Sequence, residues 1–210
     1  MQGRHVVVTG GRGALGKAVV ATLEARGAVV HVPDLAAVDL SREADAVAYY
    51  AALPPLWASI QLAGGFAMAP ITETSFADFE SQWKTNAVTC FLACREAVRA
   101  IRRAGGGGRL VNVAARTVAA PTGGMTAYIA SKASVAAMTQ GLAAELASEA
   151  ILVNAVLPSL IDTPANRAAM PSADHGSWPK PTELANTIVF LASPDNALTS
   201  GALVPVYGRV

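Results

Sequence analysis

Residues 5–16 read HVVVTGGRGALG, and this stretch decides the class of fold that the sequence predicts. Its apolar, β-branched beginning is typical of a buried strand, and the Ala-rich stretch that follows has the period of a helix. Glycine has no Cβ, so a glycine-rich turn between strand and helix lets a pyrophosphate approach the backbone at the helix N-terminus. Glycines that serve only the geometry of the turn would give the same pattern. We favour a dinucleotide site, and the residues expected to line it are Gly10, Arg12, Gly13, Ala14, Leu15 and Gly16.

Short β-branched runs alternate with longer Ala-rich stretches along the rest of the chain. This alternation indicates βαβ units and a parallel sheet. The expected strands cover residues 4–9, 28–33, 37–40, 57–63, 109–114, 151–157 and 201–206. The expected helices cover residues 14–26, 42–52, 76–104, 126–148 and 181–193. We therefore expect an α/β fold, a single doubly wound Rossmann domain over residues 1–210 with a mainly parallel seven-stranded sheet.

The composition argues against several classes of function. Apolar residues make up 52% of the chain and charged residues 15%, which is typical of a folded protein with a sizeable core. The formal net charge of +1 gives no electrostatic reason to expect nucleic acid or an anionic membrane as a partner. No apolar stretch approaches the ~20 residues that cross a bilayer. The first strand begins too early for a signal peptide, so we expect a cytoplasmic protein.

Cys90 and Cys94 are the two cysteines of the chain, and they lie four residues apart in a helical pattern. A disulfide within one helical turn has unfavourable geometry, and two sulfurs without further ligands are a poor zinc site. We interpret both as small buried hydrophobic residues and expect no metal.

The second expected strand ends at Asp34, in AVVHVPD. An acidic residue at this position can accept hydrogen bonds from the adenosine ribose hydroxyls and would repel a 2′-phosphate. We therefore favour NAD(H), although Arg12 in the glycine turn could hold a 2′-phosphate and keeps NADP(H) possible. Asp39 could reach the adenine amino group, or it could serve as the N-cap of the next helix.

The stretch TAYIASKASVAAM at residues 126–138 carries the catalytic prediction. Tyr128 and Lys132 are four residues apart and so share one face of a helix. A phenol with an ordinary pKa near ~10 is a poor acid–base catalyst at neutral pH, and a neighbouring ammonium lowers that pKa. The spacing alone is weak evidence, but together with the glycine turn in this chain order it predicts a proton-transfer pair beside a nicotinamide.

With these motifs the sequence closely resembles the short-chain dehydrogenase/reductase family over essentially its whole length. The resemblance rests on TGGRGALG at 9–16, GRLVNV at 108–113, YIASK at 128–132 and LPSLIDTP at 157–164. It implies that Asn86, in WKTNAV, supports a water in the proton relay. The alternative is a polar residue that bonds locally within its helix. The resemblance also implies that Thr163 and the backbone near Ile161 face the nicotinamide carboxamide. Further cofactor contacts implied by the resemblance are Ala63, Gly64, Lys132 and Pro158.

The sequence departs from the family at the position thirteen residues before Tyr128, where a Ser usually polarises the substrate carbonyl. Ala115 stands there, and Thr117 or Thr122 could supply the missing hydroxyl. Ala115, the GGRGALG turn and the run Ala63-Gly64-Gly65 together resemble the dihydropteridine reductase branch. The substrate of that branch, a quinonoid dihydropterin, accepts hydride into an already conjugated ring. The alternatives are an oxidoreductase of another small carbonyl or alcohol, and a catalytically weak NAD(H)-binding sensor.

The expected helices at 76–104 and 126–148 are apolar on more than one face. A helix of this kind is buried on two sides, so one side of each can pack on a second subunit, as the family resemblance also implies. We expect a homodimer or homotetramer. Between these helices and the end of the chain, residues 164–181 lose all periodicity, and we expect them to form a mobile excursion over the ligand site.

Overall fold

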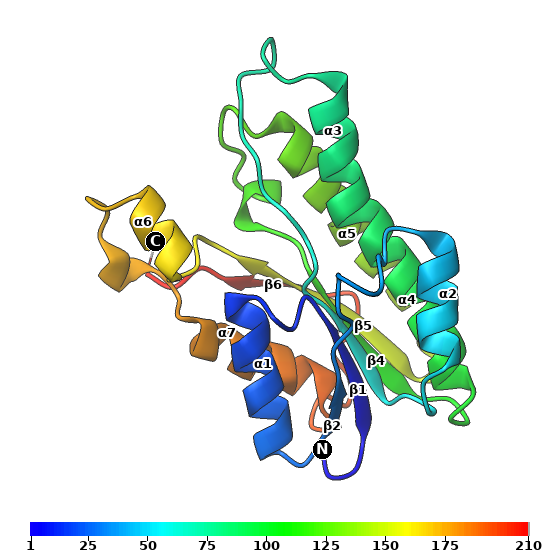
Figure 1. Ribbon diagram of the computed structural model, residues 1–210. Helices are drawn as coiled ribbons and strands as arrows, with labels where there is room; N and C mark the ends of the chain where they lie inside the picture. Colours follow the sequence, from blue (N-terminus) through cyan, green and yellow to red (C-terminus); the bar gives the residue numbers. More distant parts are fainter. Residues whose placement is uncertain (210) are drawn as a thin grey trace.

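Six parallel strands form one sheet in the computed structural model, which describes residues 1–209 (Figure 1). Its order is β2-β1-β3-β4-β5-β6. The strands are β1 His5–Thr9, β2 Val29–His31, β3 Ala58–Gln61, β4 Gly108–Val113, β5 Ile151–Pro158 and β6 Leu203–Val206. The next two strands of the chain, β2 and β3, pair with β1 on opposite sides. A doubly wound sheet binds its ligand at such a reversal, beyond the carboxyl ends of the strands.

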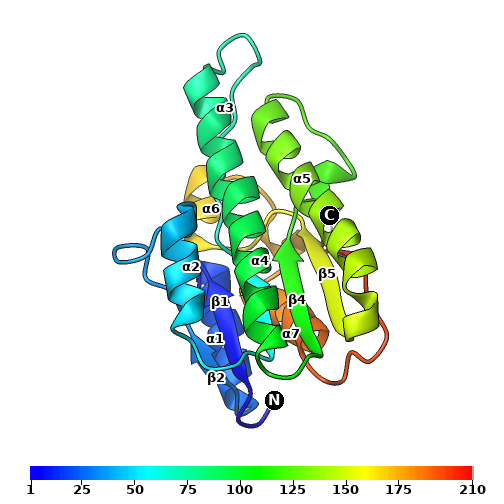
Figure 2. The ribbon, with the colours of Figure 1, turned by 90° about the vertical axis from the view of Figure 1, so that its right-hand side faces the viewer.

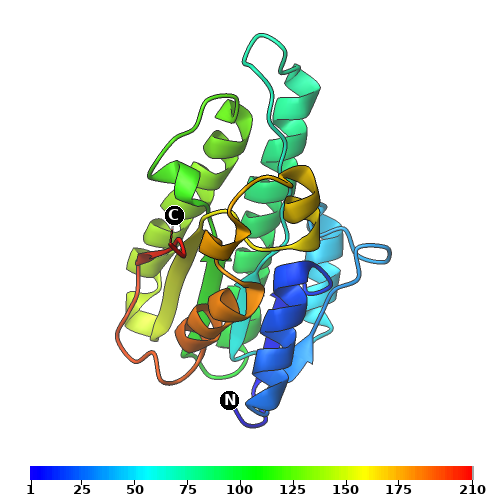
Figure 3. The same ribbon diagram turned by 90° about the vertical axis from the view of Figure 1, so that its left-hand side faces the viewer.

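Helices cover both faces of the sheet. Figure 2 shows α2, α4 and α5 on one face, and Figure 3 shows α1 and α7 on the other. The α-helices are α1 Ala14–Ala25, α2 Glu43–Ala51, α3 Phe76–Trp83, α4 Thr89–Arg102, α5 Thr126–Glu145, α6 Pro164–Ala169 and α7 Pro181–Ala192. The expected α/β architecture with a parallel sheet is confirmed.

The valine run of β1 belongs to two separate cores. Val6 and Val8 pack in the cluster that includes α1 and α7, whereas Val7 packs in the cluster that includes α2, α4 and α5. All three side chains are fully buried. Successive side chains of a strand point to opposite faces, so a strand covered on both faces needs a continuous apolar run. This double burial fixes where β1 ends and where the glycine turn begins.

The strand predicted at residues 37–40 is wrong, and the sheet has six strands within residues 1–209 where seven were expected. The backbone N–H groups of Ala37 and Val38 both donate to the carbonyl of Asp34, at 2.9 and 2.8 Å. These bonds close a turn, and a second turn, in which the Arg42 N–H donates to the Asp39 carbonyl at 2.9 Å, leads into α2. The segment is too short to turn and also add a strand to the sheet.

The helix predicted at residues 76–104 changes its winding in the middle. A π-helical turn, Lys84–Val88, separates α3 from α4 and contains Asn86. Such turns are rare and are frequent at functional sites. A capping box opens α3: the Ser75 side chain accepts from the Asp78 N–H, and the Asp78 carboxylate accepts from the Ser75 N–H.

Candidate active site

The glycine turn connects β1 to α1, and its glycines differ in the space that surrounds them. Gly10 has a φ of 66°, and a Cβ on it would lie 2.8 Å from the backbone nitrogen of Ala63. A Cβ on Gly16 would lie 2.2 Å from the carbonyl oxygen of Gly10. A Cβ on Gly13 would lie at an ordinary 3.4 Å from that oxygen, and Gly13 has a φ of −70°. The fold therefore requires Gly10 and Gly16 but leaves the space beside Gly13 open.

A cavity of about 560 Å³ opens at this turn. Gly13 is the N-cap of α1, and no described side chain accepts a hydrogen bond there, so the N–H groups of the first helical turn are available to an anion. The cavity reaches from the glycine turn past the end of β2 to the π-helical turn. Its lining includes Gly10, Arg12, Gly13, Asp34, Asp39, Ala63, Gly64, Ser81, Lys84 and Thr85. Ala14 and Leu15 begin α1 beside it. These residues fit a dinucleotide whose phosphates bind at Gly13.

Arg12 and Asp34 form an ion pair across this cavity, with the Arg12 Nη1 2.8 Å from the Asp34 Oδ2. The pair joins the two residues on which the cofactor preference was expected to depend. Asp39 accepts from the N–H and hydroxyl of Ser41 at 3.0 and 2.6 Å, and these bonds lower its pKa. The alternative that Asp39 caps the next helix is wrong, because the N-cap of α2 is Arg42.

Tyr128 and Lys132 lie one turn apart on α5, as expected. Lys132 is 7% exposed and donates through Nζ to the carbonyl of Val113 at 2.9 Å. Burial lowers the pKa of Lys132 to about 8 and raises the pKa of Tyr128 to about 12. The expected lowering of the Tyr128 pKa is therefore absent, because desolvation disfavours the phenolate and the ammonium is directed at a carbonyl. At neutral pH both groups hold their protons.

Asn86 is 1% exposed and binds the loop that follows β3. Its Oδ1 accepts from the Gly65 N–H at 3.1 Å, and its Nδ2 donates to the Gly65 carbonyl at 3.0 Å. The same Nδ2 lies 3.2 Å from the hydroxyl of Ser131, which in turn donates to the carbonyl of Tyr128 at 2.7 Å. Protein groups thus bind both the donor and the acceptor of the Asn86 side chain.

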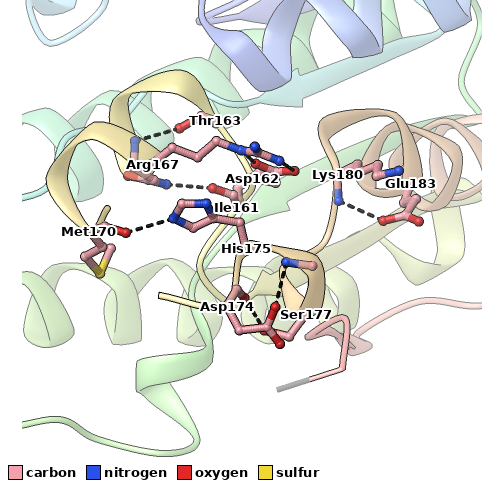
Figure 4. A network of polar contacts seen from close by, with 12 residues as sticks. Ile161, Asp162, Thr163, Arg167, Met170, Asp174, His175, Ser177, Lys180 and Glu183 are labelled. Atoms are coloured by element: carbon pink, nitrogen blue, oxygen red, sulfur yellow. Dashed lines mark hydrogen bonds and ion pairs between the residues drawn. The ribbon is translucent and has the colours of Figure 1, made fainter. Parts of the chain in front are cut away.

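The segment after β5 is built from local hydrogen bonds (Figure 4). The Thr163 hydroxyl caps α6 by accepting from the Asn166 N–H at 3.2 Å, and the Ile161 carbonyl accepts from Asn166 Nδ2 at 2.8 Å. Arg167 donates to both carboxylate oxygens of Asp162, at 2.5 and 2.8 Å. The excursion expected without regular structure therefore contains a helix, α6, and a 3-10 turn, His175–Ser177. Pro158, at the end of β5, is buried.

Comparisons with known proteins agree with this geometry. A family model described as enoyl-(acyl carrier protein) reductase matches residues 1–208. The chain belongs to the short-chain dehydrogenase/reductase family. The members of this family are NAD(P)-dependent oxidoreductases.

Individual relatives match nearly the whole chain. An uncharacterized short-chain type dehydrogenase/reductase of Sinorhizobium fredii is 31% identical over 98% of this chain, which spans 43% of that relative's length. D-threitol dehydrogenase of Mycolicibacterium smegmatis is 28% identical over 99% of this chain and 93% of its own length. The solved structure of a short-chain type dehydrogenase/reductase from Mycobacterium ulcerans has a TM-score of 0.92 and 26% identity, covering 100% of this chain and 90% of that one.

Ala115 stands where the short-chain dehydrogenase/reductase family usually has a serine, and here the chain departs from the family's usual chemistry. Ala115 is 6% exposed and offers no hydroxyl. The hydroxyl of Thr117 is buried and has no hydrogen-bond partner within the described part of the chain. Thr122 is exposed on the loop before α5.

The sequence analysis missed one aromatic side chain next to Tyr128. The ring of Phe66, on the loop after β3, lies edge-on to the Tyr128 ring with 5.0 Å between centroids, and Phe66 is 57% exposed. The signal available in the sequence was a lone aromatic residue within a Gly- and Ala-rich loop that follows the carboxyl end of a strand. The cavity residues Lys84 and Thr85 were also missed, because their approach depends on the π-helical turn.

Within residues 1–209, no group of three or more His, Cys, Asp or Glu side chains is placed so that it could hold a metal ion. Among the helices of that range, none combines the length and the apolar character needed to span a membrane.

Proposed function

We propose that this chain is an NAD(P)H-dependent reductase that transfers hydride to a small cyclic substrate, with Tyr128 as the proton donor. The observation that carries the proposal is the position of Tyr128 on α5, one helical turn from the buried Lys132. Burial raises the pKa of Tyr128 to about 12, which favours the protonated phenol. Gly64 connects this pair to the dinucleotide cavity, because a Cβ on Gly64 would lie 3.2 Å from Lys132 Nζ. A protonated phenol at this place suits reduction, in which the product gains a proton.

The residues of the chain have distinct roles in this proposal. The first turn of α1 binds the phosphates, and Asp34 binds the adenosine ribose. When bound, the nicotinamide cofactor supplies the hydride. Tyr128 gives the proton to the substrate, and Lys132 turns from the Val113 carbonyl toward the nicotinamide ribose and the phenol. Its positive charge then opposes the effect of burial on Tyr128 and eases release of the proton.

Ala115 supports a cyclic, conjugated substrate. A simple ketone gains from a hydroxyl that polarises its oxygen, and Ala115 supplies none. A quinonoid dihydropterin is already electron-poor and needs chiefly a proton donor and a flat surface. The alternative within the same chemistry is reduction of a small carbonyl compound or oxidation of an alcohol, of which the D-threitol dehydrogenase relative is an example by its name.

For the cofactor we propose a preference for NAD(H). The carboxylate of Asp34 lies at the cavity, where it can accept from ribose hydroxyls, and its ion pair with Arg12 neutralises the cation that a 2′-phosphate would need. NADP(H) binding would require Arg12 to leave this pair, which an exposed pair permits at small cost.

The test is steady-state oxidation of NADH and of NADPH with a quinonoid dihydropterin, a set of aldehydes and ketones, and a set of polyols in the reverse direction. The proposal predicts turnover of cyclic acceptors and faster reaction with NADH. Turnover confined to polyols would favour the alcohol dehydrogenase alternative. Cofactor binding without turnover of any substrate would favour a sensor and contradict the proposal.

We also propose that the chain forms a homodimer or a homotetramer, and that copies pack against one another through α4 and α5. A groove of about 430 Å³ runs between these helices, and its lining includes Phe91, which is 50% exposed, Met138 and Gly141. Arg99 and Glu145 line the same groove, so a two-fold axis can bring each beside its opposite charge on a second copy. Sedimentation at micromolar concentration should give at least twice the mass of the chain, and a monomer would contradict this.

A further inference from the structure

The surface beside the Tyr128 ring is made by the loop after β3. Residues 62–71 read LAGGFAMAPI, without a charged or hydrogen-bonding side chain. Three of these side chains are well exposed: Phe66 at 57%, Met68 at 57% and Ile71 at 67%. Burying an aromatic ring from water is favourable, so an exposed ring at a candidate active site indicates a contact still to be made.

Phe66 is held in place from both sides. On one side, both backbone groups of Gly65 bind the buried Asn86 amide, which is also bonded to Ser131 on α5. On the other side, the Ala69 N–H donates to the Gly124 carbonyl at 2.9 Å, which joins this loop to the loop before α5. The fold thus holds the backbone on both sides of Phe66, and Asn86 is a positioning residue for this loop.

The chemistry of this surface selects among substrates. A polyol needs several hydrogen-bond partners, and the side chains of residues 62–71 offer none. A flat ring can pack on the polarizable surface of Phe66 and Met68 while its reacting atom faces the Tyr128 hydroxyl. We infer that Phe66 is a specificity-determining residue that selects a planar aromatic or conjugated ring over a saturated ring or a polyol. This inference rests on the proposed reductase function, because it takes Tyr128 as the point of reaction.

The experiment compares a flat ring with a saturated ring of the same skeleton. Binding of 2-naphthamide and of decahydro-2-naphthamide to the NAD⁺-loaded protein is measured by titration calorimetry, which requires no turnover. Phe66→Leu removes the ring and Phe66→Tyr keeps it. Phe190→Leu removes a Phe that is 45% exposed on α7, a helix on the face of the sheet opposite α5. The ratio of the two dissociation constants cancels effects that are common to both ligands.

We expect the wild type to prefer the flat amide, and Phe66→Leu to reduce this preference about 2- to 10-fold, the range for an aromatic pair contact. Phe66→Tyr and Phe190→Leu should leave the ratio within about twofold of wild type. A ratio unchanged by Phe66→Leu, or no preference in the wild type, would overturn the inference. A change in oligomeric mass with an unchanged ratio would also overturn it, and would assign the surface to subunit contact.

The matching aldehydes test the proposed function separately. Reduction of 2-naphthaldehyde and its decahydro counterpart should show the same change of ratio in kcat/KM, carried mainly by KM. If neither aldehyde nor any other acceptor turns over, the proposed function fails, while the amide ratio still decides the role of Phe66.

Discussion

The two ends of the proposed site are built on different principles. At the phosphate end, between β1 and α1, the backbone makes the site, and close approaches exclude a Cβ at Gly10 and Gly16. At the reaction end, buried side chains make the site, and Asn86 and Lys132 owe their positions to bonds with Gly65 and Val113. Disturbing the first end should affect folding and cofactor binding together. Disturbing the second should change chemistry while leaving the fold intact.

The largest effect should come from the reaction end. Tyr128→Phe removes the proton donor, and proton transfer by a placed group is worth about 10²–10⁴-fold in rate. We expect kcat to fall by that amount, while the dissociation constant for NADH stays within about twofold because the phosphate end is untouched. Stopped-flow kinetics with cofactor titration measures both quantities. Turnover within a few-fold of the wild type would remove Tyr128 from the mechanism.

At the phosphate end, two glycines separate the needs of the fold from those of the ligand. Gly16→Ala places a methyl group against the Gly10 carbonyl oxygen and should cost about 1–3 kcal/mol of unfolding free energy. Gly13→Ala should cost about 1 kcal/mol or less, because its Cβ has room and only the N-cap preference is lost. Both should weaken NADH binding at least about tenfold. Chemical denaturation and calorimetry measure the two effects.

The Gly13→Ala variant also tests whether the phosphates bind at Gly13. If Gly13→Ala bound NADH as tightly as the wild type, the open space beside Gly13 would not be the phosphate site. The cavity would then need another ligand.

The protonation of Lys132 gives the reaction end a pH dependence. Its pKa is lowered by burial to about 8, so the ammonium is lost as pH rises through that value, well below the pKa of about 10.4 for free lysine. Tyr128 stays protonated over the same range. We expect kcat/KM for reduction to be level between pH 6 and 7.5 and to fall about tenfold per unit well above pH 8. A profile that stays level to pH 10 would show that the charge of Lys132 is not needed.

The lowered pKa of Lys132 also changes stability: the unfolding free energy should rise with pH over the range in which kcat/KM falls. The unfolded chain keeps the Lys132 proton up to higher pH than the folded chain, so between pH 8 and about 10.4 the unfolded state binds more protons. Burial of this charge therefore weakens the fold below pH 8, and that cost is relieved as pH rises. In Lys132→Met this contribution to the pH dependence of the unfolding free energy should disappear.

The smallest effect concerns the cofactor preference. Asp34→Ala frees Arg12 from its ion pair and removes the charge that repels a 2′-phosphate. We expect the ratio of kcat/KM for NADPH to that for NADH to rise about tenfold, because the exposed pair itself is worth little. Arg12→Ala in the same background should cancel the gain. An unchanged ratio would show that Asp34 does not contact the ribose.

The sequence was informative where local rules govern the structure. The β1–turn–α1 unit and the face shared by Tyr128 and Lys132 follow from valine runs, glycine spacing and helical period. The turn at Asp34 was misread as the start of a strand because Val38 and Leu40 have strand character, whereas two backbone hydrogen bonds decided the outcome. The position of Phe66 could not be predicted, because it depends on a bond from Gly65 to Asn86, twenty-one residues away. The raised pKa of Tyr128 depends on burial, which the spacing of Tyr and Lys does not reveal.

A crystal structure of the protein with NAD⁺ bound would test the central claim most directly. The account predicts the diphosphate on the first turn of α1 at Gly13, and the nicotinamide ring close to the Tyr128 hydroxyl. Lys132 should have moved from the Val113 carbonyl to the nicotinamide ribose. A cofactor bound elsewhere, or a nicotinamide far from Tyr128, would contradict the account.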